Sequence, residues 1–497
     1  MQLVAYGAQD VYLTGNPQIT FFKVVYRRHT NFSMECIRQT VSGNLSYGKN
    51  ASATISRNGD LIGQIYITYK IDQSAKFKEG IKEGSDILLS DITLCCSNFG
   101  NALIRTADIE IGGQLIDRQD GRFMQIHSDI TEYNPTLNPS GSTKYQKLTG
   151  TGANLTELKI DFETHPTDGN MRYNVKNKDL MPSQSTKSDT TYWVPLKFWF
   201  CRNPGLALPL IALQYHEVKV SIELQEKHKL FNYWVKDPTS GLKVIQGCLT
   251  PDMYKLVDTE LWVDYYYLDT DERRRFAQVS HEYLIEQVQI KKNNFSNASG
   301  DSQINLNFNH PVKELLWVFT GDTEVNLNSG FFPGVAVRDL TDQFQPYNEF
   351  PSLSIEGVKG DMIRDLNQMS DRRPTTKKFT ANLKKPSINK GAKFKLTLNG
   401  QDRFDERDSF YFSNTQLWKH HSGSGSAFPI GSIHVYSFAL KPEEHQPSGT
   451  CNFSRIDSSQ LHISNADFKM VHEIIIYAIN YNVLRIMSGM GGLAYSN

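Results

Sequence analysis

One pattern of hydrophobic residues occurs twice in this chain, and it limits the fold more than any other feature. Near the middle, residues 193–200 form an aromatic run typical of a buried strand, and a break follows at Pro204. Residues 218–224 then alternate between apolar and polar side chains, as in a strand with one solvent-exposed face. Near the C-terminus an aromatic strand again meets a proline, Pro442, which lies 238 positions after Pro204. Self-similarity at this scale indicates an internal duplication, so we expect two similar β domains.

Three further pairs of segments support the duplication, because they occur in the same order in both halves. The pairs are residues 29–39 with 281–289, 109–114 with 396–401, and 260–263 with 473–476. The offsets within these pairs are 252, 287 and 213, so the connecting loops would differ in length while the order of strands is kept. The length of 497 residues also exceeds what one core usually supports.

Charge and motif content argue against several functional classes. Lys plus Arg and Asp plus Glu each number 53, whereas a protein that wraps a genome would carry a basic excess to neutralise phosphates. The six cysteines form no CxxC pair and have no histidine at zinc spacing. Gly43 to Asn50 nearly matches a phosphate-binding loop but lacks the hydroxyl residue and the following helix, so a turn between strands is expected. We therefore predict no catalytic set, metal or cofactor, and no direct genome wrapping.

Two clusters of polar residues could be mistaken for sites. His420 and His421 are adjacent, but no acidic or thiol residue lies at ligand spacing, and we interpret them as an exposed pair beside a Ser/Gly loop. The acidic cluster of Asp402, Asp405, Glu406 and Asp408 lies in one segment. A single segment does not place two carboxylates across a scissile bond, so we interpret these as solvated turn residues.

The remaining segments divide the chain. Long polar stretches at residues 133–191 and 320–389, and a shorter one at 226–250, lack periodicity and are predicted loops, the first two of unusual length. Residues 119–131 fit a short helix, and the charged segment 269–277 marks a junction. The division that we predict is an N-terminal arm over 1–19, a first domain over 20–269, a linker over 270–280 and a second domain over 281–497.

Several motifs, spread from one end of the chain to the other, resemble the major capsid proteins of nucleocytoplasmic large DNA viruses, most closely those of algal and protist viruses. The motifs are GAQDVYLTGNPQITFFKVVYRRHTNF (7–32), SRNGDLI (56–62), PGLALPLIALQYHEVK (204–219), HEYLIEQ (281–287), LNGQDRF (398–404), YSFALKPEEHQPSGTCNFSRID (436–457) and NYNVLRIMSGMGGLAYSN (480–497).

This resemblance implies an all-β fold of two consecutive eight-stranded jelly rolls, with long inserted loops and a few short helices. It also implies a structural protein, not an enzyme, that forms homotrimeric capsomers of pseudo-hexagonal outline. The partners that it implies are neighbouring capsomers, minor capsid proteins and an inner membrane under an icosahedral shell. We expect synthesis in the host cytoplasm and a final location in the virion. The two longest loops would form the outward crown of the capsomer, and the arm would lie at its inner base.

The sequence suggests a few contact residues. Asn154 is a candidate glycosylation site on its long loop. Arg27 and Arg28 are candidates for contacts at the inner base. A basic run is a candidate polyanion or neighbour contact, or a solvated loop neutralised by acidic residues upstream; it includes Arg372, Arg373, Lys377, Lys378, Lys384 and Lys385.

Two other functions compete with a capsid role. One is a glycan-binding β-sandwich protein, for which exposed aromatic residues on loops would be needed; Tyr133, Tyr145 and Tyr173 are the candidates. The other is a carbohydrate-active enzyme on a similar fold.

Overall fold

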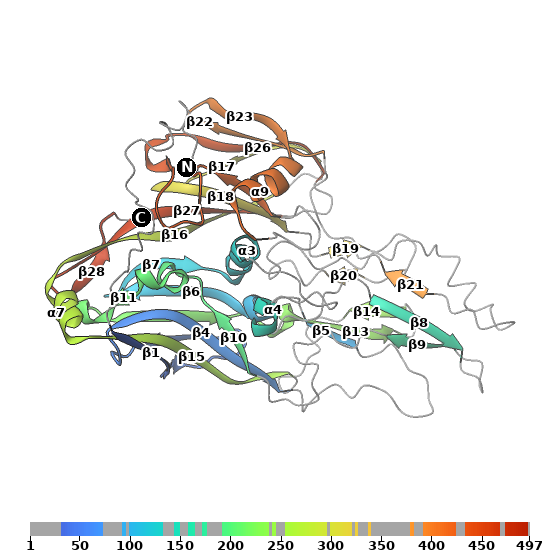
Figure 1. Ribbon diagram of the computed structural model, residues 1–497. Coiled ribbons are helices and arrows are strands. Elements are labelled where there is room, and N and C mark those ends of the chain that lie inside the picture. The colour runs from blue at the N-terminus through green and yellow to red at the C-terminus, as the bar shows by residue number, and fades with distance from the viewer. Residues whose placement is uncertain are drawn as a thin grey trace, which may run out of the picture.

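The chain is described here from a computed structural model (Figure 1). The described residues are 31–72, 92–95, 99–132, 144–149, 158–164, 171–175, 191–237, 241–244, 254–295, 299–320, 324–326, 336–338, 378–381, 391–423, 433–467 and 473–495.

Two facing antiparallel sheets form the first roll. The strands of one sheet, in spatial order, are β1 (Phe32–Gln39), β15 (Lys255–Leu268), β4 (Leu61–Asp72) and β10 (Tyr192–Pro195), with β11 (Leu208–Pro209) also on β4. The strands of the other are β2 (Ser42–Gly43), β3 (Asn50–Thr54), β12 (Val218–Leu224), β6 (Ile104–Ile111) and β7 (Gln114–Gln119). Alternate side chains point inward: along β12, buried residues alternate strictly with partly exposed ones.

The second roll repeats this arrangement. One sheet contains β16 (His281–Asn294), β27 (Glu473–Met487), β18 (Pro311–Thr320) and β24 (His434–Ser437), with β25 (Cys451–Asn452) on β18 and β28 (Met490–Leu493) on β27. The other contains β17 (Ser299–Asn305), β26 (Ser459–Asp467), β22 (Lys393–Leu398) and β23 (Gln401–Asp408). The pairing is the same in both rolls: β1 pairs with β15, which pairs with β4, and β16 pairs with β27, which pairs with β18. The predicted double jelly roll is therefore confirmed.

The sequence matches that suggested the duplication fall on equivalent strands. Residues 109–114 and 396–401 cover the β6–β7 and β22–β23 hairpins. Both turns place two consecutive residues at positive φ: Gly112 and Gly113 at 58° and 81°, and Asn399 and Gly400 at 49° and 76°. This is the turn type that matches strand twist, and it explains why glycine or asparagine occupies these positions.

Smaller sheets lie at one end of the molecule, opposite β28 and α7 (Thr270–Gln278) (Figure 1). Their strands are β14 (Gly241–Val244), β13 (Phe231–Asp237) and β5 (Ile92–Cys95) in one, β21 (Lys378–Ala381), β8 (Leu158–Thr164) and β9 (Met171–Val175) in another, and β19 (Glu324–Asn326) with β20 (Ala336–Arg338) in a third. The segment 226–250, predicted as a loop, thus contains a hairpin. The two longest loops are also joined, because β21 from one pairs with β8 from the other.

Helices are few and short. They are α2 (Phe99–Leu103), α3 (Gly121–Thr131), α4 (Lys144–Thr149), α5 (Trp199–Arg202), α6 (Lys227–Leu230), α7 and α9 (Gln416–His420), with a π-helical turn, η4 (Tyr411–Thr415), and 3-10 turns η2 (Pro204–Leu206), η3 (Leu210–Ala212) and η5 (Phe453–Arg455). None of the helices in the described ranges has the length and hydropathy needed to cross a bilayer.

The predicted strand over residues 193–200 is wrong in its second half. Strand β10 ends at Pro195, and α5 begins at Trp199. Phe198, Trp199 and Phe200 are all buried in the core of the first roll. A strand would send consecutive side chains to opposite faces, whereas the short helix lets all three enter the same core.

Strand β27 is the longest strand of the second roll and contains polar residues in its interior. It runs unbroken through the polar residues Asn480 and Asn482. Their amides are satisfied inside the fold: Gln289 donates to Asn480 Oδ1 at 3.0 Å, and Asn482 donates to Gln287 Oε1 at 2.9 Å. Buried polar groups with partners do not interrupt a strand.

Candidate assembly surfaces

The two rolls of one chain are joined by an apolar contact on the outer face of a second-roll sheet. Helix α3 of the first roll follows β7 and places Phe123, Ile126 and Ile130 on this face. The sheet residues that meet them are Val288, Leu316, Val318, Val435, Ile475, Tyr477 and Ile479. The rings of Phe123 and Tyr477 lie 5.6 Å apart. The helix therefore covers a sheet face that would otherwise be exposed and apolar.

Hydrogen bonds between strand edges complete this contact, which we call the inter-roll joint. The backbone N–H of Val288 on β16 donates to Asp117 Oδ1 on β7 at 3.0 Å, and the Gln287 amide donates to the carbonyl of Ile116. Burial raises the pKa of Asp117 to about 6, although the bonds from Val288 and Gln119 act in the opposite direction.

A buried charge cluster lies at the same joint, around a pocket of about 320 Å³. Arg202 of α5 is 2.9 Å from Glu286 of β16, so this ion pair crosses from one roll to the other. The second carboxylate oxygen of Glu286 is 2.6 Å from Lys313 Nζ. Burial alone would raise the pKa of Glu286, but Arg202 and Lys313 lower it below its usual range, because both cations stabilise the ionised form.

His421 is part of this cluster, and its interpretation as an exposed residue is wrong. Its side chain is fully buried, with Nε2 at 3.0 Å from Glu314 and Nδ1 at 3.2 Å from Glu443. The two carboxylates lie on other segments of the second roll, so no local spacing in the sequence could indicate them.

The equivalent sheet of the first roll, β1–β15–β4–β10, also has apolar side chains on its outer face, but no helix of the described residues buries them as α3 buries those of the second roll. Two facing pairs on its outer side, Met34 with Tyr266 and Tyr66 with Trp262, occupy the places that Val288 with Ile479 and Val318 with Ile475 occupy in the second roll. The four second-roll residues are at most 8% exposed, whereas Met34 is 59% exposed and its three companions are partly exposed.

Aromatic rings form two groups on this first-roll face, and the facing pair of Cys36 and Asp264 lies between them. Trp193 lies 5.6 Å from both Tyr66 and Trp262, and Phe32, which is 59% exposed, lies 6.5 Å from Tyr266. Burial raises the pKa of Tyr66 to about 12, so its phenol remains neutral. At the border, Arg38 pairs with Glu260 at 2.7 Å. Aromatic residues are enriched in protein interfaces, which favours such a role for this face.

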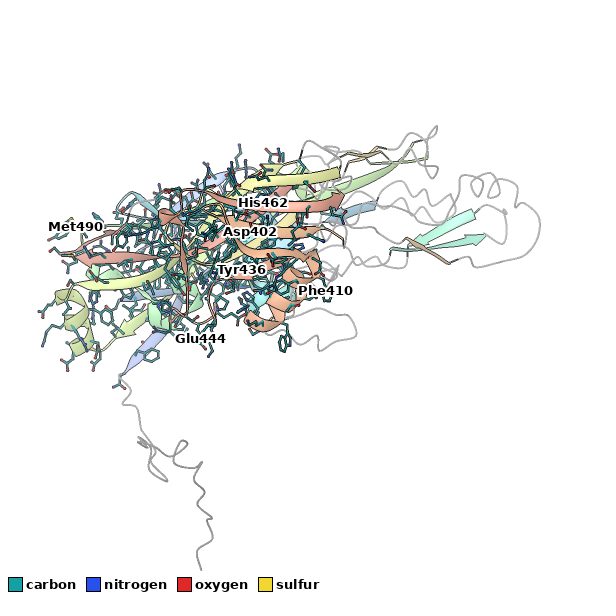
Figure 2. The ribbon with its side chains drawn as sticks, turned by 90° about the horizontal axis from the view of Figure 1, so that it is seen from above. Asp402, Phe410, Tyr436, Glu444, His462 and Met490 are labelled. Carbon is teal, nitrogen blue, oxygen red and sulfur yellow. The ribbon has the colours of Figure 1, made fainter. Side chains whose placement is uncertain are left out.

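Three exposed apolar side chains, which we call the apolar ridge, lie on or beside the second-roll segment that follows β23, as α3 follows β7 in the first roll. They are Phe410, Trp418 and Leu440, which are 64%, 85% and 74% exposed. Phe410 precedes η4 and α9, and Figure 2 shows it at the edge of the second roll. Leu440 adjoins the end of α9, because its carbonyl lies 3.1 Å from His420 Nδ1.

The start of this segment repeats the start of α3. Asp120 accepts a hydrogen bond from the N–H of Phe123, and Asp408 accepts one from the N–H of Tyr411, also three residues ahead. Ile130 and Trp418 each lie ten residues after these aspartates, and the second-roll segment passes through the π-helical turn η4 on the way. Ile130 is buried in the inter-roll joint, whereas Trp418 is the most exposed of the large apolar side chains in the described ranges.

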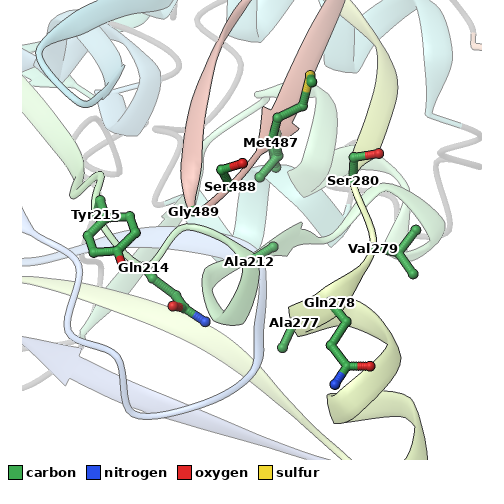
Figure 3. A pocket seen from close by; sticks show the side chains of 11 residues that line it. Ala212, Gln214, Tyr215, Ala277, Gln278, Val279, Ser280, Met487, Ser488 and Gly489 are labelled. Carbon is green, nitrogen blue, oxygen red and sulfur yellow. The ribbon is translucent and has the colours of Figure 1, made fainter.

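A second pocket, of about 590 Å³, lies at the end of the molecule that carries α7 and β28 (Figure 3). Tyr215 and Val279 border it on opposite sides, and the turn at Ser488 and Gly489 lies between them (Figure 3). Its lining contains no charged side chain.

Most of the contact residues suggested by the sequence lie outside the described residues. These are Asn154, Arg27, Arg28, Arg372, Arg373, Lys377, Lys384 and Lys385. Lys378 begins strand β21, where its backbone pairs with that of Asp161. The candidate glycan-stacking residue Tyr133 is also outside these ranges, and Tyr173 lies in β9.

Two local interpretations need correction. Tyr145 is buried, not exposed, and its hydroxyl donates to Asn101 Oδ1 at 2.9 Å, so it cannot stack on a sugar. The acidic cluster lies on the exposed strand β23, not in a turn. There Asp402 accepts from Thr397 at 3.0 Å and pairs with Lys395 at 3.3 Å.

Comparisons with known proteins agree over the whole chain. The family model "Major capsid protein N-terminus" matches residues 20–269, and the model "Large eukaryotic DNA virus major capsid protein" matches residues 272–492. The chain is 41% identical to the major capsid protein of Phaeocystis pouchetii virus and 36% identical to that of Paramecium bursaria Chlorella virus 1. Each match covers 100% of this chain and 99% of the relative.

Solved structures match as well. The quasi-atomic model of the PBCV-1 virus capsid superposes with a TM-score of 0.63 at 30% identity, covering 96% of this chain and 100% of the matched chain. The Faustovirus major capsid protein superposes with a TM-score of 0.60 at 12% identity, covering 97% and 94%. At that identity the second likeness concerns the fold alone.

Proposed function

The chain belongs to the major capsid proteins of large eukaryotic DNA viruses, and we propose that three copies of it form a capsomer of pseudo-hexagonal outline. As a member of this family it is a structural component of a virus capsid and not an enzyme. What the proposal adds is how copies of the chain contact one another.

The observation that carries the proposal is the unequal cover of two equivalent sheet faces. In the second roll the outer face of the β16–β27–β18–β24 sheet is buried under α3 of the same chain. In the first roll the equivalent face retains exposed Met34 and Phe32 and partly exposed tyrosine and tryptophan rings. The ridge of Phe410, Trp418 and Leu440 is the equivalent of the covering helix, and it is exposed too. We therefore infer that the first-roll face and the ridge of Phe410, Trp418 and Leu440 bind each other.

The ridge of one copy would therefore cover the first-roll face of the next copy, as α3 covers the second-roll face within the chain. Such a contact joins two different surfaces, so it is heterologous and must close into a ring to be finite. Three chains give six rolls and six similar contacts. The three contacts within chains are the inter-roll joints, and the three between chains are the proposed ones.

Light scattering from the purified full-length protein tests the assembly state. An obligate contact of this kind buries on the order of 2,000 Å² or more, so the complex should persist at micromolar concentration. The expected mass is three times the chain mass of 56.6 kDa. A protein that remains monomeric in native buffer would refute the capsomer.

The orientation of the capsomer in the shell forms a second part of the proposal. The two longest loops would face outward, and the arm over residues 1–19, with Arg27 and Arg28 close behind it, would face the inner membrane or minor capsid proteins. In support, β8, β9, β20 and β21 of those loops lie at the end of the molecule opposite α7 (Figure 1). The first described strand, β1, begins at Phe32, whose partner Leu268 lies two residues before α7.

Limited proteolysis of intact particles would distinguish this orientation from its reverse. Early cuts are expected within residues 133–191 and 320–389, because exposed polar loops are the usual sites of nicking. The arm should remain intact until the shell is opened. If the arm is cut first while both loops resist, the proposed orientation is wrong. That result would not bear on the proposed trimer.

The finer assignments remain part of this proposal. They are the division into an arm (1–19), a first roll (20–269), a linker (270–280) and a second roll (281–497), glycosylation at Asn154, neighbour contacts by the basic run, and synthesis in the host cytoplasm. Neighbouring capsomers and minor capsid proteins would meet the outer sides of the trimer.

A further inference from the structure

Two histidines from different rolls lie near the same pocket: His127 lines it, and His421 contacts its lining residues Glu314 and Glu443. The groups that these histidines face require opposite protonation states. His127 is on α3 of the first roll, and His421 follows α9 of the second. The other charged or titratable residues that line the pocket are Arg202 of the first roll and Glu286, Lys313, Glu314, Glu443 and His445 of the second.

His127 has to be neutral because of the group that it faces. Arg202 Nη1 lies 3.1 Å from His127 Nε2, and a guanidinium can only donate, so Nε2 must present its lone pair. Nδ1 then carries the proton and lies 3.2 Å from Thr131 Oγ1, whose hydroxyl donates to the His127 carbonyl at 2.6 Å. A proton on Nε2 would set two donors and two positive charges against each other. Burial lowers the pKa of His127 well below its usual range, and the charges of Arg202, Lys197, Lys313 and His421 lower it further.

His421 has to be charged for the opposite reason. Both of its ring nitrogens face carboxylates, Glu314 at 3.0 Å and Glu443 at 3.2 Å, and two acceptors need two N–H groups. Burial alone would lower the pKa of His421, but Glu314 and Glu443 raise it to about 9.

Each histidine acts on contacts that cross the inter-roll joint. The Arg202 guanidinium that donates to His127 also forms the cross-roll pair with Glu286. On the other side, the Glu443 carboxylate accepts a hydrogen bond from the N–H of Ser422 at 2.8 Å. The segment after His421 then bonds to the end of α3: Ser422 Oγ donates to the carbonyl of Thr131 at 2.9 Å, and Gly423 N–H donates to that of Ile130 at 2.8 Å.

We propose that the inter-roll joint is a two-sided pH-sensitive latch, which weakens when His127 gains a proton or His421 loses one. Acidification would push Arg202 away from its position between His127 and Glu286. Alkalinisation would leave Glu314 and Glu443 facing each other around a neutral ring, and the bonds from residues 422 and 423 to α3 would weaken. The latch operates within one chain and does not depend on how copies assemble.

The direction of each effect follows from linkage. His127 has a folded pKa below its ordinary value of about 6.5, so its contribution to stability is complete above that pH and falls as the pH drops through it. His421 has a raised folded pKa, so its contribution is complete below about pH 6.5 and is lost as the pH rises through about 9. Asp117 acts in the opposite direction: because its pKa in the folded protein is raised to about 6, its protonation stabilises the folded state as the pH falls.

Single variants separate these contributions. His127→Gln keeps an acceptor for Arg202 that does not titrate, and His421→Gln removes the alkaline titration. His462→Gln, on β26 of the other second-roll sheet, is the control. For each purified full-length protein, Tm and the exchange protection of the Val288 and Gly423 amides are measured from pH 5 to 9.5. A buried amide in the first-roll core, that of Val220, serves as the reference.

The wild type and the His462→Gln protein should lose protection at both amides at each end of the pH range, while the Val220 amide stays protected. His127→Gln should remove the acid-side loss, and His421→Gln should be less stable near neutral pH and lose the alkaline-side change. If His421→Gln does not fold, the loss of Gly423 protection in the wild type between pH 7.5 and 9.5 tests that side alone. An acid-side loss that persists in His127→Gln, or wild-type protection at Gly423 that does not change with pH, would overturn the latch.

Discussion

Replacing Trp418 with aspartate should dissociate the trimer into monomers. The indole is 85% exposed in a single chain, and in the proposed ring it lies on the aromatic face of the next copy. Loss of a tryptophan at the centre of an interface costs about 2–4 kcal/mol, and a buried unpaired carboxylate adds to this. Each contact would weaken by roughly 30- to 700-fold, and light scattering over a concentration series would measure the shift.

Tyr215→Asp provides a matched control for this variant. Tyr215 is 76% exposed, lines the pocket at the α7 end (Figure 3) and belongs to neither of the two proposed surfaces. It should assemble as the wild type does. Because Trp418 is exposed within its own chain, the free energy of unfolding of the monomer should hardly change in either variant. A Trp418→Asp protein that remains fully trimeric would exclude the ridge as an interface.

The second large effect concerns the core. Phe198→Ala and Trp199→Ala should each lower the free energy of unfolding by about 3–5 kcal/mol, because each removes a buried aromatic side chain and leaves a cavity. Phe198 is 0% exposed and stacks on Phe200 with ring centroids 6.0 Å apart, and Trp199 is 1% exposed and meets the edge of the same ring at 5.0 Å. Denaturant unfolding with intrinsic fluorescence measures the loss.

A milder substitution checks the physical reason for this loss. Phe198→Leu keeps most of the buried volume and should cost less than Phe198→Ala. Val279→Ala, at an exposed position, should cost little. Wild-type stability in both alanine variants would mean that the aromatic block does not hold the first roll together.

The strand framework could be predicted from the sequence because period-2 patterns and turn glycines are local signals. The hairpin at Gly112 and Gly113 and its counterpart at Asn399 and Gly400 both follow from residues that tolerate positive φ. The failures occurred where a local pattern has two structural solutions. Three consecutive aromatic residues at 198–200 fit a strand by propensity, and only the shape of the core shows that they form a short helix.

The joint and the assembly surfaces depend on contacts between distant segments, which no local pattern reveals. His421 pairs with Glu314, far away along the chain, and β21 pairs with β8 across the boundary between the rolls. The exposed strand β23 is rich in charge and therefore resembles a turn. The duplication becomes informative only once the structure is known, because a repeat that is buried in one roll and exposed in the other then indicates a missing partner.

Electron cryomicroscopy of the purified capsomer, at a resolution that shows side chains, would show whether the ridge of one copy covers the first-roll face of the next. We expect a three-fold ring in which Trp418 of each copy lies on the outer face of the β1–β15–β4–β10 sheet of the next, near Met34, Tyr66 and Trp262. A trimer in which this face and the ridge of Phe410, Trp418 and Leu440 both face solvent, or in which each contacts its own counterpart, would contradict it.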